Sequence, residues 1–186
     1  YPPNVPFLHS PLLTDLSTME QEPGFELRFP DPDNIMDFEL IITPQDGMYV
    51  GARFHFTVHV TADYPFAPPK VHCDTTVFIL WVFFFFFRPA ATFSQLFTQN
   101  IDLEGHVCLN ILRESWSPAL NITSIAFGLL FLFHAPNADD PLNKEAAEFM
   151  QSHPAEFERA VRATLRGGFF YGKQFKRHVK ASFLFF

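Results

Sequence analysis

The chain has 186 residues and a net charge of −7, and 48% of its residues are hydrophobic while 18% are charged. These values are typical of one folded domain with modest extensions, and they exclude a largely disordered protein. The acidic balance argues against nucleic acid as a partner, because binding phosphates requires clustered Lys and Arg.

The cysteine content and the apolar runs indicate the compartment. Cys73 and Cys108 are too few for a disulfide framework and fit a reducing environment. The first residues lack a basic segment followed by an apolar one, so we expect no secretory signal. The longest apolar run, residues 77–87, is too short to span a bilayer. We therefore expect a cytoplasmic and nuclear protein with no membrane partner.

The N-terminal part of the chain is expected to form a short helix and four strands. Residues 1–11 are rich in proline and are expected to be loose, and Leu12, Leu16 and Met19 follow at helical spacing. Apolar residues then alternate with polar ones in four ranges separated by turn residues. The ranges are 25–29, 36–42, 54–60 and 70–73. This pattern predicts an antiparallel meander with one solvent-exposed face.

Helical spacing returns in the last third of the chain. Asn121 is expected to cap a first helix, a second helix should cover residues 144–151, and a third should begin near Pro154. Strands first and helices afterwards predict an α+β fold with the helices packed on one side of the sheet. We expect one domain over residues 12–168, followed by a C-terminal tail over 169–186.

Residues 79–99 do not fit this order. Five consecutive phenylalanines occupy positions 83–87, and such a run has neither the period of a strand nor that of a helix. We interpret the block as an insertion that forms an extruded loop, since the cost of closing a loop grows only slowly with its length. Phenylalanine codons are rich in pyrimidines, so we further interpret the block as translated intron.

Cys108 is the candidate nucleophile. A thiolate is a good nucleophile, and its thioesters stay reactive toward amines. Two other interpretations remain open at this point: a small buried core residue, or a Cys-His protease with His106 as the base. His55 and His59 lie four residues apart on one strand face, too far apart to share an ion, so we expect no metal site.

Three motifs follow one another along the chain. Residues 64–71 read YPFAPPKV, residues 100–118 read NIDLEGHVCLNILRESWSP, and residues 136–143 read PNADDPLN. In this order they resemble the motifs of the ubiquitin-like-protein conjugating enzymes, which share the UBC fold, and three ordered motifs are a specific signal. Within the family, residues 29–33, 100–112 and 140–148 look most like the neddylation branch, whereas 116–120 look more like the ubiquitin-specific members.

The resemblance implies a transferase that passes a ubiquitin-like modifier to a substrate lysine, on cullins in the neddylation branch. Cys108 would accept the modifier from its activating enzyme as a thioester. Asn100 would steady the oxyanion, and Asp140 would orient the lysine and help remove its proton. The exposed apolar residues that would meet a RING-type ligase are Phe66, Pro118 and Ala119. No metal or organic cofactor is implied, because the activating enzyme uses the ATP.

Structural roles are the alternative for several of these residues, and the chain departs from the family pattern in two places. Asn100 and Pro118 would then shape their loops, and Asp140 would be a solvated turn residue. The family has His-Pro directly before Asn100, where this chain has Thr98-Gln99. The first helix also lacks the usual basic residues. The alternative functions are therefore a ubiquitin-conjugating enzyme and a catalytically impaired, ligase-binding variant.

Overall fold

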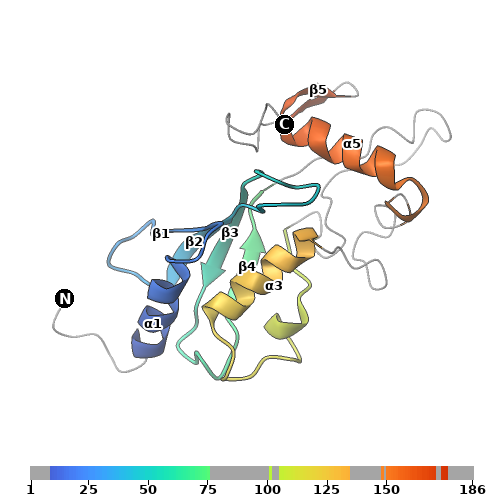
Figure 1. Cartoon of the computed structure of the whole chain (residues 1–186). Helices are drawn as coiled ribbons and strands as arrows, with labels where there is room; N and C mark the ends of the chain where they lie inside the picture. Colours follow the sequence, from blue (N-terminus) through green and yellow to red (C-terminus); the bar gives the residue numbers. More distant parts are fainter. Residues whose placement is uncertain are drawn as a thin grey trace.

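The sheet forms as the alternating pattern predicts. The computed structural model describes residues 9–75, 101, 105–134, 148, 150–170 and 173–175. Its four antiparallel strands lie in the order β1-β2-β3-β4 (Figure 1). They are β1 (Phe25–Arg28), β2 (Asp37–Ile42), β3 (Phe54–His59) and β4 (Lys70–Cys73). Each strand lies inside the range that the sequence indicates, so the predicted meander is confirmed.

The two faces of the sheet differ because apolar and polar residues alternate. On the inner face, Leu40 pairs with Phe56 across β2 and β3, and both are fully buried. On the outer face, His59 Nδ1 lies 2.5 Å from Asp37 Oδ1, and His55 Nδ1 lies 2.6 Å from Glu39 Oε1. The hydrogen bond with His59 holds the pKa of Asp37 below its usual value. The two histidines therefore bind separate carboxylates.

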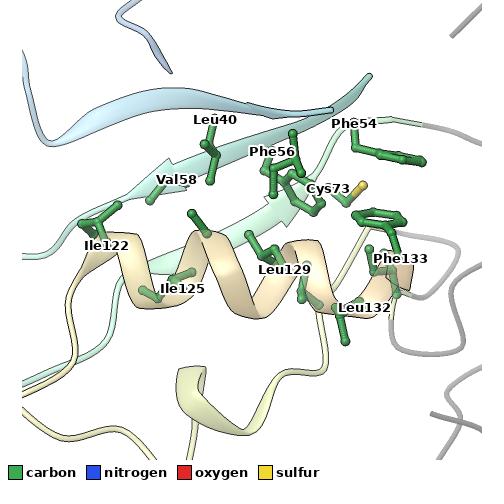
Figure 2. Close-up of a cluster of buried hydrophobic side chains, with 14 of the residues drawn as sticks. Leu40, Phe54, Phe56, Val58, Cys73, Ile122, Ile125, Leu129, Leu132 and Phe133 are labelled. Atoms are coloured by element: carbon green, nitrogen blue, oxygen red, sulfur yellow. The ribbon is translucent and has the colours of Figure 1, made fainter. Parts of the chain in front are cut away.

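Helix α3 (Ile122–His134) packs along the inner face of the sheet (Figure 2). The Asn121 side chain caps it as predicted, because the Ser124 backbone N–H donates to Asn121 Oδ1 at 2.8 Å. The rings of Phe54 on β3 and Phe133 on α3 stack with their centroids 3.8 Å apart. Burying a side chain of this size stabilises the fold by about 1.5–3 kcal/mol. The strands thus enclose their core against this helix.

The remaining helices contribute to the same core. Helix α1 (His9–Met19) buries Leu12, Leu16 and Met19, and α5 (Pro154–Leu165) buries Phe157, Val161 and Leu165. We expected a loose segment up to residue 11, and this boundary is wrong because α1 already begins at His9. Pro11 lies in the first helical turn, where proline is tolerated. Residues 148 and 150–152 are helical, and the rest of the predicted second helix lies outside the described residues.

A short hairpin follows α5 and was not expected from the sequence. Gly167 ends the helix with a φ of 77°, and β5 (Gly168–Phe170) then pairs with β6 (Lys173–Phe175). The hairpin straddles the predicted boundary at residue 168 between domain and tail. The predicted insertion, residues 79–99, lies outside the described residues. None of the described helices combines the length and hydropathy needed to cross a membrane.

Candidate active site around Cys108

The two thiols have opposite environments. Cys73 ends β4, is 5% exposed and points into the apolar core (Figure 2). Its Sγ lies 3.7 Å from the Thr75 carbonyl oxygen, and burial raises its pKa to about 12. Cys108 is partly exposed. Because the thiolate is the nucleophile, Cys73 is chemically inert at neutral pH and Cys108 is the thiol that can react.

The segment that carries Cys108 pairs with the edge of the sheet at β4. The Cys73 backbone N–H donates to the Gly105 carbonyl oxygen at 2.9 Å, and isolated bridges join His72 to His106 and Ile101 to Val107. Strand β4, which precedes residues 76–100, is therefore hydrogen-bonded to the segment that follows them. Cys108 follows directly after these pairings, so the sheet fixes where its backbone lies.

Only glycine fits at position 105. Its φ is 88°, a conformation that other residues rarely adopt. A Cβ atom there would lie 2.4 Å from the Cys73 carbonyl oxygen and 2.6 Å from His72 Cε1. The first of these atoms belongs to the backbone, which cannot move aside. The close approach of the Cys108 segment to β4 therefore requires this residue.

The chain turns tightly after Cys108. The 3₁₀ turn η1 (Asn110–Leu112) is closed by the Leu112 N–H, which donates to the Leu109 carbonyl at 2.9 Å. Val107 before the cysteine is 7% exposed, and Leu109 after it packs against the core. Cys108 is thus the reactive side chain between two anchored apolar neighbours, which is a suitable setting for a positioned nucleophile.

Phe66, Pro118 and Ala119, the predicted ligase-facing residues, are all exposed, and Phe66 is 78% exposed. The structure joins their two loops. Trp116 Nε1 donates to the Pro65 carbonyl oxygen at 2.9 Å. An exposed apolar group on a fixed loop is typical of a partner-binding surface. Sequence reasoning did not identify this link between the two loops.

The buried hydroxyl of Tyr64 is a second connection that sequence reasoning missed. It donates to Asp15 Oδ2 of α1 at 2.5 Å. Burial is the main reason why the pKa of Tyr64 is raised, and the hydrogen bond to Asp15 raises it further. The Tyr64 and Trp116 rings lie 6.1 Å apart. The Tyr64 side chain therefore joins α1 to the proline-rich loop.

Asn100 and Asp140 lie outside the described residues, so their roles stay predictions. In the part of the chain that the structure describes, no three His, Cys, Asp or Glu side chains are grouped so that they could hold a metal ion. The chemistry available from the described site is that of the Cys108 thiol.

We expect an alkylating reagent to distinguish the two thiols. Iodoacetamide at pH 8 should modify Cys108 in the folded protein and leave Cys73 unmodified, because Cys73 is buried and its pKa is about 12. Peptide mapping by mass spectrometry measures both sites. In denaturant both cysteines should react, which is the control. Equal modification of Cys73 in the folded protein would contradict this assignment.

Comparisons with known proteins identify the family. The model of the family described as "Ubiquitin-conjugating enzyme" matches residues 11–165. The solved structure of S. cerevisiae Ubc12 superimposes with a TM-score of 0.73 and 36% sequence identity, covering 96% of this chain and 89% of that one. The predicted UBC fold is thereby confirmed.

Curated relatives identify the branch. The Dictyostelium discoideum "NEDD8-conjugating enzyme Ubc12" is 47% identical over 88% of this chain, which spans 63% of that relative's length. The Drosophila melanogaster "Nedd8-conjugating enzyme UbcE2M" is also 47% identical, over 75% of this chain and 67% of the relative. The chain therefore belongs to the ubiquitin-conjugating enzyme family, and its similarity to these NEDD8-conjugating relatives confirms the predicted resemblance to the neddylation branch.

Proposed function

We propose that this protein accepts NEDD8 from its activating enzyme as a thioester on Cys108 and transfers it to a substrate lysine. The observation that carries the proposal is the placement of Cys108. It is a partly exposed thiol in a segment fixed on the sheet edge, in a chain of the NEDD8-conjugating branch. The other thiol is buried with a raised pKa.

The reaction consists of two successive acyl transfers at the thioester carbonyl carbon of NEDD8. The Cys108 thiolate attacks the thioester carbonyl carbon of NEDD8 on the activating enzyme; a new C–S bond forms, and the activating enzyme leaves as its thiolate. The lysine amine then attacks the same carbon, forms an amide bond, loses a proton and displaces the Cys108 thiolate. ATP is used upstream by the activating enzyme, so these steps need no metal or organic cofactor.

Two side chains outside the described residues are proposed to assist. Asn100 donates its side-chain amide to the oxyanion that forms during attack on the carbonyl. Asp140 orients the incoming lysine and accepts its proton, which is needed because a free lysine amine has a pKa of about 10. Both roles follow from the motif resemblance.

The ligase and the target complete the proposal. A RING-type ligase binds the exposed surface of Phe66, Pro118 and Ala119, and the lysine belongs to a cullin. The exposure of these three residues and the hydrogen bond between Trp116 and Pro65 that joins their loops support this surface. We place the protein in the cytoplasm and nucleus, where the two free cysteines stay reduced.

Loading with purified components tests the function. With the NEDD8-activating enzyme, ATP and NEDD8, the wild-type protein should form an adduct that a thiol reductant removes. Cys108→Ser should form an oxyester that survives the reductant, because an ester is less reactive toward thiols than a thioester. Gel mobility with and without reductant measures both.

The controls separate the alternatives. Cys73→Ala should load like the wild type, and ubiquitin with its own activating enzyme should load more slowly than NEDD8. Faster ubiquitin loading would move the protein to the ubiquitin branch. A folded protein that binds the ligase and forms no adduct would instead be a ligase-binding variant without activity.

Asp140→Ala should leave the loading of NEDD8 onto Cys108 unchanged and should slow its transfer from Cys108 to lysine. We expect single-turnover transfer to free lysine to fall by about 10²-fold near neutral pH, the usual size of a general-base contribution. The deficit should shrink as the pH rises toward the pKa of the amine, because the amine then needs less help. Discharge equal to that of the wild type from neutral to alkaline pH would show that Asp140 has no such role.

A further inference from the structure

Gly128 lies in the middle of α3 at the place where the helix meets the Cys108 segment. A Cβ atom at this position would lie 3.0 Å from Leu109 Cδ2 and 3.0 Å from Ile111 Cδ1. Carbon atoms in ordinary contact are about 3.5–4.0 Å apart. Any side chain here would therefore push against the two apolar residues that follow the nucleophile at positions +1 and +3.

A glycine inside a helix has an energetic cost that calls for a reason. Relative to alanine it destabilises a helix interior by about 0.5–1 kcal/mol, because it loses more backbone freedom on folding. Of the nearby residues on α3, Ala126 and Leu129 are fully buried, whereas Phe127 is 46% exposed. The close approach of Leu109 and Ile111 is the feature of the structure that an alanine at 128 would disturb.

We propose that Gly128 is a positioning residue for Cys108: the missing side chain lets Leu109 and Ile111 pack against α3 and so sets the position of the nucleophile. The inference rests on the proposed function of Cys108. Gly105 allows the same segment to approach β4 from the other side. The Cys108 segment is thus held between a strand and a helix, and each contact depends on a glycine.

The expected effect follows from the geometry. Relieving two contacts at 3.0 Å requires the Cδ atoms of Leu109 and Ile111 to shift by a few tenths of an ångström. A misplacement of about 1 Å at a reacting atom can lower a rate by about 10²-fold. We therefore expect Gly128→Ala to lower the maximal rate of single-turnover NEDD8 loading by about tenfold. The half-saturating concentration of charged activating enzyme should stay within about twofold, because the change is confined to the contact between α3 and the Cys108 segment.

Second-site rescue distinguishes positioning from general damage. Ile111→Val removes the Cδ1 atom that the new Cβ would meet, and Leu109→Val removes both Cδ atoms. Adding these two changes to Gly128→Ala should restore most of the loading rate. Leu112→Val is the matched control, because the three atoms nearest to the added Cβ belong to Leu109 and Ile111. It should give no rescue.

Hydrogen exchange gives a readout that does not depend on activity. The amides of Leu112 and Arg113 close the turn after Cys108 by donating to the carbonyls of Leu109 and Asn110. In Gly128→Ala they should exchange about tenfold faster, while amides in the middle of α3 stay protected. If the wild type fails to load NEDD8, the proposed function is wrong, and this exchange measurement still tests the role of Gly128.

Two results would overturn the inference. One is a Gly128→Ala protein with wild-type loading and wild-type exchange at Leu112 and Arg113. The other is a triple variant in which the melting temperature recovers and the loading rate does not, since Gly128 would then be a packing residue with no effect on the nucleophile.

Discussion

The placement of Cys108 depends on the hydrogen bond from the Cys73 backbone N–H to the Gly105 carbonyl. At 2.9 Å it joins the reactive segment to the edge of a sheet whose other strands are already paired. A single hydrogen bond contributes only about 0.5–1.5 kcal/mol. Burial of Ile101 and Val107 beside it adds about 1.5–3 kcal/mol for each side chain. Hydrogen bonding therefore sets the register of the segment, and apolar burial supplies most of its stability.

Helix α3 connects the Cys108 segment to the loops of Phe66 and Pro118. Its middle packs against Leu109 and Ile111, which follow Cys108. It also packs against α1, whose Asp15 accepts a hydrogen bond from the Tyr64 hydroxyl. The loop of Phe66 follows Tyr64 directly and is joined to the loop of Pro118 through Trp116. A nucleophile and an exposed apolar surface are thus both connected to the buried face of one helix, so each keeps its geometry when a partner binds the other.

The periodicity of apolar residues predicts the strands and helices that bury one face. It does not predict contacts between residues that lie far apart in the sequence. The four strands and the helix after Asn121 follow from alternation, helical spacing and a capping residue. The hairpin after Gly167 was missed because strands of three residues carry too little alternation to detect. The Asp15–Tyr64 and Trp116–Pro65 hydrogen bonds and the approach of Leu109 to Gly128 join segments far apart in the chain, and no local pattern encodes them. Cys108 was found through its motif.

Hydrogen exchange at two adjacent amides tests most directly whether the Cys108 segment is held on the sheet. The Cys73 N–H donates to Gly105 of that segment, whereas the Asp74 N–H donates to the His55 carbonyl of β3 at 2.8 Å. If the segment is a fixed part of the domain, NMR should show the two amides exchanging at similarly slow rates. Exchange at Cys73 faster than at Asp74 by about a hundredfold would mean that the segment detaches from an intact sheet, and would contradict the account.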